Sequence, residues 1–583
     1  MGEVVISDFQ VGRWLVKPSL NVISRNGTAA RVEPKVMEVL VCLAKHPGET
    51  LSKETLLQAV WPDTFVSEDA LKHSISELRR VFDDDPREPR VIQTIAKRGY
   101  RFIAAVSREA TGQTTSAVTR DSIAVLPFIN ISPDAENEFF ADGMTEEIIN
   151  ALAQIKQLHV VARSSVFSFK GKHIDPRIVG EQLNVRTVLE GSVRRIDNRL
   201  RITAQLINAA NGFHLWSECY DRDLKDIFQI QDDIARAIAT RLTIALDMRP
   251  QQPLVKPGTD NLEAYSLYVK GRALLYRRGA KIGLALECFN QAVALDSEYA
   301  LAWAGIADAY TLLAFYGFLH PETSRPKWLE AARRAIAADS FLAESHTALA
   351  FGSLMFDCDR AQAEREFLHA LDLNPFYVQA RDWYSCFYLQ VAMGRLAEAV
   401  THAISAVQAD PLSAYANGIL GLLYGTAGKY SQALHYAGRA VELDGESLLP
   451  RWVLQIVFYF SGCFAESVAA AEATLPVSGR HSWSMALLAV TLDEWGKKRE
   501  ADAVYRELLA RANREYVQPA TLAVCAGAAG QPEEAIDYAW QAMAIRDPFR
   551  IAFSTHWPLG ARFRARLHGY PRFRELLSEM GFD

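Results

Sequence analysis

The sequence predicts a multidomain chain in which two α+β domains precede an all-α solenoid. Its 583 residues are enough for three or four domains. Residues 107–120, SREATGQTTSAVTR, are small and polar, as expected of a linker. Glycines recur every 34 residues in the last third of the chain, whereas the preceding part mixes strand-like and helix-like patterns. These observations predict domains at 1–106, 121–248 and 259–583, with the linker at 107–120.

The composition is that of an ordinary globular protein. The net charge of −6 does not exclude DNA binding, because basic residues can be concentrated on one face. Seven cysteines are dispersed with no C-x-x-C pair, which is typical of a reducing compartment. The first residues include acids and no long apolar core, and no run reaches 18 uncharged apolar residues. We therefore expect a cytoplasmic protein.

The stretch SEDALKHSISELRRVF predicts an amphipathic helix with one apolar and one polar side. Leu71, Ile75, Leu78 and Phe82 recur at spacings of four, three and four, which places them on one stripe. Ser67 is a suitable N-cap. The polar side carries the following residues, with Arg79 at its edge: Lys72, His73, Ser76, Arg79 and Arg80. A solvated face would look the same, so the helix alone leaves that alternative open.

The segments around this helix favour a DNA-binding role. Two further amphipathic helices, PKVMEVLVCLAKH and KETLLQAVW, precede it, and the hairpin VIQTIAKRGYRF follows it. Three helices and a two-stranded wing form a winged helix-turn-helix, whose second paired helix enters the major groove. Lys97 and Arg98 make the wing tip cationic for phosphates or a minor groove, and Gly99 keeps it narrow. We expect Tyr100 and Phe102 to pack into the domain.

This first domain resembles the DNA-binding domain of the OmpR/PhoB family of response regulators, and more closely the variant that opens CadC-like activators. The motifs HPG, VWP, LRR and RGYRF fall in the family's order. The resemblance implies a β-strand platform in VVISDFQVGRWLV. It also implies DNA contact through the helix and the wing, at Lys72, His73, Ser76, Arg79, Arg80, Lys97 and Arg98. The loop before the helix is implied to contact RNA polymerase, through Trp61, Pro62, Asp63, Thr64 and Phe65.

The middle domain reads as mixed α+β. SIAVLPF, LHVVAR, RTVLEGSVRRI, RLRITAQLIN and FHLWSECY predict strands, with turns at Asp197-Asn198 and Asn211-Gly212. MTEEIINALAQI and DIFQIQDDIARAIATRLTIAL predict helices. This stretch resembles the N-terminal domain of TolB, a resemblance that implies a fold and no activity.

The last domain is repetitive. The following glycines lie 34 residues apart: Gly394, Gly428, Gly462, Gly496 and Gly530. Five residues after each comes a small residue: Ala399, Ala433, Ser467, Ala501 and Ala535. A 34-residue helix–turn–helix period is the tetratricopeptide signature, in which the glycine turns the chain and the small residue lets helices approach. We expect seven or eight repeats to about residue 550, followed by a C-terminal cap.

No motif supports catalysis, a cofactor or a metal ion. There is no phosphate-binding G-x-x-x-x-G-K-[ST], no H-E-x-x-H and no paired cysteine, and the acidic run Asp83–Asp85 reads as a solvated turn. The order of the three domains resembles HilA/CadC-type regulators. It implies a sequence-specific DNA-binding transcriptional regulator, with activation favoured and the solenoid receiving a partner or signal. A homodimer on DNA is a further hypothesis. Two alternatives stay open: an interaction scaffold whose winged helix contacts protein, and an enzyme active in 121–248.

Overall fold

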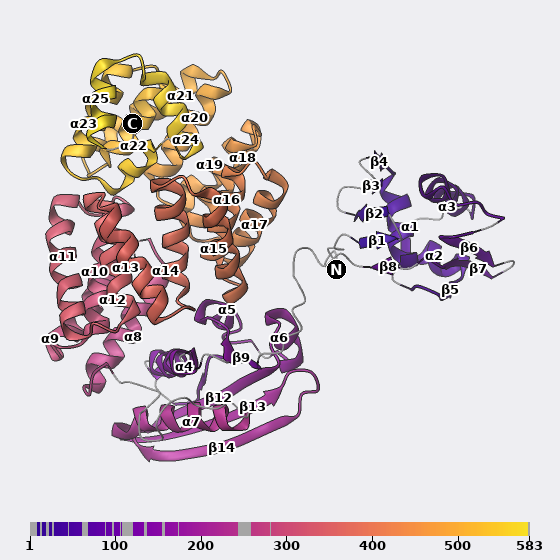
Figure 1. The fold of residues 1–583 in the computed structure, drawn as a ribbon, viewed down its shortest axis with the longest axis horizontal. Helices are drawn as coiled ribbons and strands as arrows, with labels where there is room; N and C mark the ends of the chain where they lie inside the picture. The colour runs from indigo at the N-terminus through magenta and orange to yellow at the C-terminus, as the bar shows by residue number, and fades with distance from the viewer. Residues whose placement is uncertain are drawn as a thin grey trace. The chain divides into compact units, whose positions relative to one another are not determined.

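The computed structural model forms two compact units, Met1–Thr119 and Arg120–Asp583 (Figure 1). The described residues run from 9 to 580, except for 12–13, 19–21, 26–27, 45, 61–67, 88, 96–97, 105, 108–120, 133–136, 154, 156–157, 173, 197, 243–257, 280 and 555. Nearly all of the predicted linker therefore lies outside the described residues.

The first unit opens with a five-stranded antiparallel sheet in the order β4-β3-β2-β1-β8. Its strands are β1 (Phe9–Val11), β2 (Trp14–Lys17), β3 (Val22–Arg25), β4 (Thr28–Arg31) and β8 (Val106–Ser107). The predicted platform is confirmed for β1 and β2. The other three strands, β3, β4 and β8, are short and carry little alternation, and the sequence did not predict them.

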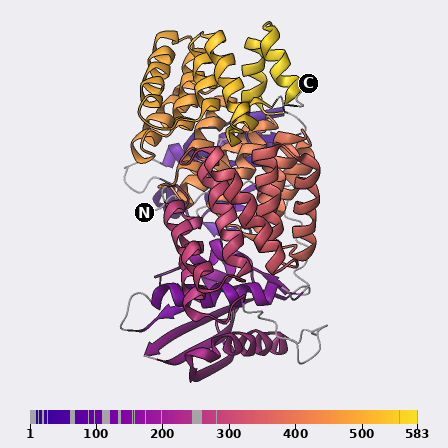
Figure 2. The same ribbon diagram turned by 90° about the vertical axis from the view of Figure 1, so that its left-hand side faces the viewer.

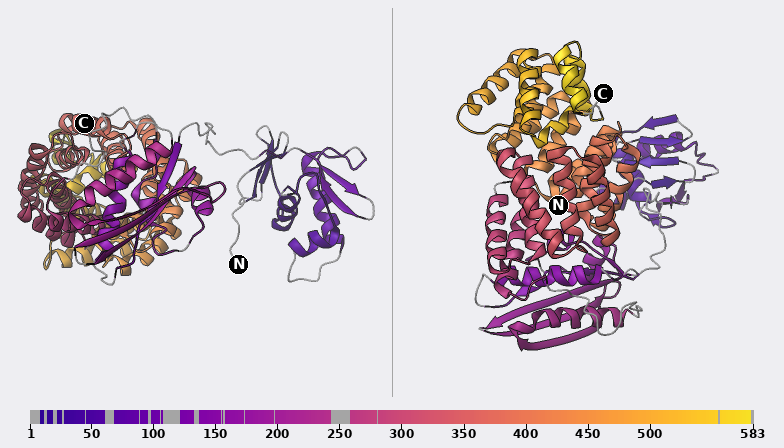
Figure 3. Two further views of the ribbon diagram at one scale, coloured as in Figure 1. Left: turned by 90° about the horizontal axis from the view of Figure 1, so that it is seen from below. Right: turned by 60° about the vertical axis from the view of Figure 1, so that its left-hand side comes forward.

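Three helices and a second sheet complete this unit. The helices are α1 (Pro34–Ala44), α2 (Lys53–Val60) and α3 (Glu68–Phe82). The second sheet, in the order β5-β7-β6, contains β5 (Thr50–Leu51), β6 (Ile92–Ile95) and β7 (Gly99–Phe102). Helix α1 packs against α2, α3 and β7. The first unit is drawn in indigo in Figure 3. The predicted winged helix is confirmed, but β5 adds a third strand to the expected two-stranded wing.

The second unit begins with a mixed sheet in the order β11-β9-β12-β13-β14, to which β10 adds by pairing with β12. The strands are β9 (Asp121–Val125), β10 (Ile129–Asn130), β11 (Leu158–Val160), β12 (Thr187–Ile196), β13 (Arg199–Asn208) and β14 (His214–Asp223). β9 is parallel to β11 and β12, and the last three strands are antiparallel. The predicted strands are confirmed. Gly212 turns between β13 and β14 at φ +74°, whereas Asp197 of the other predicted turn lies outside the described residues.

Helices cover this sheet and connect it to the helical array. They are α4 (Asn137–Ala153), α5 (Arg163–Phe167), α6 (Pro176–Leu183) and α7 (Ile227–Arg241), with the 3₁₀ turn η2 (Leu224–Asp226) before α7. α4 packs against α7 and also against α8, the first helix of the array. In Figure 2 the sheet lies at one end of this array. A single core of buried apolar residues, including Ile123, Leu152 and Ile234, is continuous with the core of the array.

Antiparallel helix pairs form the rest of the second unit. They are α8 (Leu262–Tyr276), α9 (Lys281–Leu295), α10 (Ala300–Phe315), α11 (Pro321–Ala338), α12 (Ala343–Gly352), α13 (Arg360–Leu373), α14 (Val378–Trp383), α15 (Leu396–Ala409), α16 (Ala414–Thr426), α17 (Tyr430–Leu443), α18 (Leu448–Phe460), α19 (Phe464–Val477), α20 (Ser482–Glu494), α21 (Lys498–Ala512), α22 (Pro519–Ala528) and α23 (Pro532–Ala544). π-Helical turns extend α12 through η3 (Ser353–Asp357) and α14 through η4 (Tyr384–Ala392). The 3₁₀ segment η5 (Pro548–Phe553), α24 (Pro558–Leu567) and α25 (Pro571–Glu579) end the array.

The predicted repeat geometry is confirmed. The five glycines spaced 34 residues apart have φ between +69° and +83°, the left-handed region that favours glycine. The small residues five positions later are fully buried where paired helices meet, so a larger side chain there would push the helices apart. The eight pairs from α8 to α23 agree with the expected seven or eight repeats. The chain thus ends in an all-α solenoid of the tetratricopeptide kind.

Candidate nucleic-acid interface

Helix α3 is held in the first unit by its predicted apolar stripe. Leu71, Ile75, Leu78 and Phe82 are all buried, and the ring of Phe82 meets that of Trp14 edge-on at 5.8 Å between centroids. Because a helix fixed by one stripe must present the opposite stripe outward, this packing decides which side chains reach solvent.

The outward stripe carries the predicted base-reading residues. The side chains of Lys72 and His73 are 56% and 73% exposed, and Ser76 is exposed one turn further along. Lys72 Nζ lies 2.9 Å from Asp69 Oδ1, and this hydrogen bond holds the pKa of the Asp69 carboxyl below its usual range. An exposed ion pair of this kind exchanges readily for a stronger anion such as a phosphate. All three side chains are exposed to solvent, as contacts with DNA bases would require.

The two arginines near the end of α3 differ in their surroundings. Arg80 is exposed and makes no ion pair or side-chain hydrogen bond among the described residues. Arg79 is half-buried, and its Nη2 donates to the carbonyl of Ile92 at 2.9 Å and to Thr94 Oγ1 at 2.8 Å. Arg79 therefore joins α3 to β6. The predicted phosphate contact of each arginine stays a prediction.

The aromatic residues of the wing are placed as the sequence predicts. Tyr100 and Phe102 are buried in the first unit, as predicted, and the Nε of Arg101 between them donates to Thr50 Oγ1 at 3.0 Å. Arg98 is exposed in the turn between β6 and β7. Lys97 lies outside the described residues, so its contact with DNA stays a prediction.

Gly99 is required for a reason that the sequence argument did not foresee. It has φ +139°, and a Cβ built on it would lie 1.9 Å from the backbone oxygen of Leu51. A side chain here would separate β7 from β5. The glycine therefore serves the close packing of the wing sheet as well as its turn.

Asp84 corrects the interpretation of the acidic run as a solvated turn. Asp83 and Asp85 are exposed, but Asp84 is only 6% exposed. Its carboxylate accepts hydrogen bonds from the backbone N–H groups of Arg90, Val91 and Ile92 at 2.5, 3.0 and 2.9 Å. Three such bonds fix the point where the chain enters the wing.

The segment predicted to contact RNA polymerase, Trp61 to Phe65, lies outside the described residues, as does the predicted N-cap Ser67. The sequence also did not predict a place for Thr94 on this surface, where it is exposed on β6 beside Arg79. Its position could be inferred only once the pairing of the wing with α3 was known.

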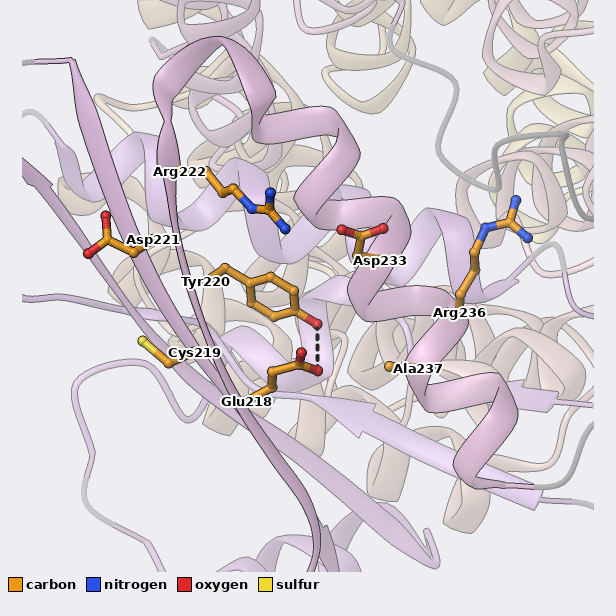
Figure 4. Close-up of a pocket in the computed structure, with 8 residues that line it drawn as sticks. All are labelled: Glu218, Cys219, Tyr220, Asp221, Arg222, Asp233, Arg236 and Ala237. Carbon is orange, nitrogen blue, oxygen red and sulfur yellow. Dashed lines mark hydrogen bonds between the residues drawn. The ribbon is translucent and has the colours of Figure 1, made fainter.

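A shallow concavity in the second unit lies between β14 and α7 and has a volume of about 560 Å³ (Figure 4). Tyr220 there donates to Glu218 Oε2 at 3.2 Å, and burial raises the pKa of Asp233. Two arginines, Arg222 and Arg236, and two further carboxylates, Asp232 and Glu218, surround that carboxyl with charges of both signs. Among the described residues no group of histidine, cysteine and acidic side chains could hold a metal ion.

Two stretches of the chain match families of known proteins. Residues 27–102 match the family described as "Transcriptional regulatory protein, C terminal". Residues 119–237 match the family described as "HilA/YgeH-like transcriptional regulator, second domain". For these stretches, the resemblance to OmpR/PhoB-type and HilA-like regulators is confirmed.

Individual relatives match parts of the chain. A protein named putative adenylate cyclase 3 from Rhizobium meliloti is 43% identical over 32% of this chain and 32% of its own. The transcriptional activator CadC of Escherichia coli is 44% identical over 17% of this chain and 19% of its own. The transcriptional regulator HilA of Salmonella typhimurium is 24% identical over 54% of this chain and 55% of its own. The chain thus spans about half the length of these relatives or less.

No helix of the described part combines the length and the apolar character needed to cross a membrane.

Proposed function

We propose that the chain is a transcriptional regulator, acting as an activator, that binds a specific double-stranded DNA sequence through its first unit. The observation that carries the proposal is the outward face of α3, where Lys72, His73 and Ser76 are exposed beside a wing with the exposed Arg98. The family match of residues 27–102 and the names of the CadC and HilA relatives support it.

In this proposal the first half of α3 lies in the major groove. Lys72, His73 and Ser76 supply donors and acceptors for base edges, and each specific base contact is worth about 1–3 kcal/mol of discrimination. Arg80 would contact a phosphate. Arg79 would do so through N–H groups other than the Nη2 group that binds β6.

The wing would follow the DNA backbone or a minor groove. Lys97 and Arg98 carry the charge for that contact, which adds affinity without reading sequence. A narrow, cationic tip on a sheet whose aromatic residues are buried suits this role. The net charge of −6 is no obstacle, since only the local charge meets the phosphates.

Further parts of the proposal concern partners and organisation. We propose RNA polymerase as the partner of residues 61–65, a protein partner or signal for the solenoid, a homodimer on DNA, and a cytoplasmic location. We also propose that 1–106, 121–248 and 259–583 act as separate functional domains joined by the linker 107–120. A reporter assay at matched promoter occupancy tests the division of labour: a 1–106 fragment should bind the same DNA but give no regulated output.

The first test of DNA binding is selection from random duplexes with the purified full-length chain. The proposal expects one enriched motif, with binding that weakens steeply as salt rises. The scaffold alternative expects a folded protein that selects no motif and captures no duplex. These outcomes exclude one another.

The enzyme alternative receives a specific motive from the relative named putative adenylate cyclase, although the match covers only 32% of that protein. We propose that this chain has no such activity. Incubation of the pure chain with ATP and Mg²⁺ or Mn²⁺ should yield no cyclic AMP above buffer, and turnover proportional to protein concentration would refute this.

A further inference from the structure

A cavity of about 1110 Å³ lies within the second unit. One wall is formed by α4 and α5, and the other by α8, α12 and α14 together with residues 410–415, 443–450 and 477–481. Its walls come from segments as far apart in sequence as Asp142 and His481. Sites for small molecules commonly have volumes of about 300–1000 Å³, so this cavity is large enough for an organic ligand.

The buried Arg272 and the half-buried Arg163 of the cavity wall share a single carboxylate. Arg163 Nε lies 3.0 Å from one oxygen of Glu146, and Arg272 Nη2 lies 3.7 Å from the other. Arg272 also donates to the hydroxyl of Tyr276 at 2.8 Å, and Arg163 lies 3.9 Å from the centre of the Phe167 ring. Two guanidinium groups thus face the carboxylate of Glu146 at this wall.

A third arginine, Arg278, makes no ion pair with the residues that the structure describes. Arg278 follows the end of α8 at φ +54° and is half-buried, with its guanidinium 5.5 Å from the ring of Tyr415 and 5.9 Å from that of Trp383. Its Nη1 is buried without a hydrogen bond, and the described residues give this side chain no ion pair. A buried guanidinium is ordinarily paired, because desolvation of a charge is costly.

Other polar atoms of the wall are also left without partners. Asp382 is 1% exposed, and its Oδ1 has no hydrogen bond, nor has the hydroxyl of Tyr377. Burial raises the pKa of the Asp382, Asp410 and Glu344 carboxyls, which favours their uncharged forms.

The remaining lining is rich in rings. The aromatic residues of the wall include Tyr276, Tyr316, Phe318, Phe376, Tyr377 and Tyr415 as well as Phe167. The cavity therefore combines an aromatic surface with the Arg278 guanidinium, which makes no ion pair among the described residues, and with buried polar atoms of Asp382 and Tyr377 that have no hydrogen bond. That combination suits a ligand with a flat ring and an anionic group.

We propose that this cavity binds a small aromatic organic anion, whose acidic group pairs with Arg278 and whose ring lies against the tyrosines of the wall. The site is separate from the DNA-binding unit, and the proposal does not depend on that function. Its ligand would contact both the mixed-sheet part of the second unit and its helical array. The two already meet where the hydroxyls of Ser164 and Ser165 donate to Asp410.

The test is a fluorescence titration of the full-length chain with 8-anilinonaphthalene-1-sulfonate, a probe that is itself an aromatic anion. Saturable binding to the folded protein is expected. Competition with AMP and with 4-hydroxybenzoate distinguishes a phosphate from a carboxylate as the anionic group, and displacement by either supports the site. Inorganic phosphate lacks a ring and should displace the dye poorly, so equal displacement by phosphate would overturn the aromatic part of the proposal.

Variants locate the probe. Arg278→Asn removes the guanidinium with a residue that tolerates positive φ, and should weaken dye binding about tenfold or more. Arg506→Ala, an exposed arginine of α21, is the matched control and should leave binding unchanged. If Arg278→Asn lowers the melting temperature, a second variant is used instead. Ala273→Phe narrows the cavity and should abolish dye binding. Absence of saturable binding in the wild type, or unchanged binding in both cavity variants, would overturn the proposal.

Discussion

The Nη2 group of Arg79 donates a hydrogen bond to Thr94 Oγ1 across 2.8 Å and so joins α3 to the first strand of the wing. The same group donates to the carbonyl of Ile92 at 2.9 Å. The residue that the sequence pattern assigns to DNA thus also fixes α3 and the wing, the two elements proposed to contact DNA, relative to each other. In the proposed complex it would place Arg98 on the backbone while Lys72 and His73 face the bases.

Arg79→Ala should loosen the wing. Loss of two charge-assisted hydrogen bonds should speed hydrogen exchange of the amides of residues 91–95 at least about tenfold, because each such bond contributes about 1.5–3 kcal/mol. Mass spectrometry of the exchanged peptides measures this. Arg80→Ala, the neighbouring cation without such bonds, is the control. Equal exchange in wild type and Arg79→Ala would show that Arg79 does not hold the wing.

Arg98→Ala should weaken binding to all DNA sequences alike. Removal of one phosphate contact should lower the slope of log affinity against log salt by about one, since one fewer counterion is released. Titrations of a selected and a scrambled duplex over a range of salt concentrations give both values, with Arg506→Ala as a control for lost charge. An unchanged slope would rule out a backbone contact by Arg98.

Asp84→Asn should destabilise the first unit. The amide offers one acceptor oxygen where the carboxylate serves three backbone N–H groups, so we expect a loss of about 1–3 kcal/mol in the free energy of opening. Hydrogen exchange of the slowest amides of α1 reports that value. Asp85→Asn, an exposed neighbour, should change it by much less. A similar loss in both variants would contradict the assigned role of Asp84.

Acid should destabilise the solenoid through His481. Its Nε2 lies 2.9 Å from the carbonyl of Tyr316, its Nδ1 accepts from the N–H of Trp483, and burial lowers its pKa to about 4. The unfolded chain takes up a proton below pH 6.5 while the folded one does not, so stability falls as the pH drops from about 6.5 to about 4, by roughly 3 kcal/mol at most.

Thermal unfolding over that pH range tests this expectation. The melting temperature of His481→Gln should depend less steeply on pH than that of the wild type. His435→Gln, at an exposed position of α17, should keep the wild-type dependence. Parallel curves for the wild type and His481→Gln would exclude His481 as the cause.

The sequence predicted those features that depend on regular spacing. The stripe of Leu71, Ile75, Leu78 and Phe82 repeats with the helical period, and Gly394 and its counterparts repeat with the period of the solenoid. Periodic burial follows from backbone geometry alone, so these predictions needed no tertiary contacts. The exposure of Lys72, His73, Ser76 and Arg80 follows in turn from the buried stripe.

The rest depends on residues that meet only in the folded chain. Asp84 looks like its exposed neighbours in sequence, and only the path of residues 90–92 shows why it is buried. Gly99 packs against Leu51, a strand residue that precedes α3 in the sequence. The cavity brings Arg163, Arg272 and Asp382 together without any shared motif. No local pattern contains such pairings.

The central claim, that the exposed face of α3 reads DNA sequence, is tested most directly by the specificity ratio of Lys72→Ala/His73→Ala/Ser76→Ala. The measurement compares affinities for a motif selected by the wild-type chain and for a scrambled duplex at one fixed salt concentration. We predict that the wild type prefers the motif by about a thousandfold or more. The triple variant should lose most of that ratio while still binding both duplexes weakly through the wing. A variant that retains the wild-type motif and ratio would contradict the account.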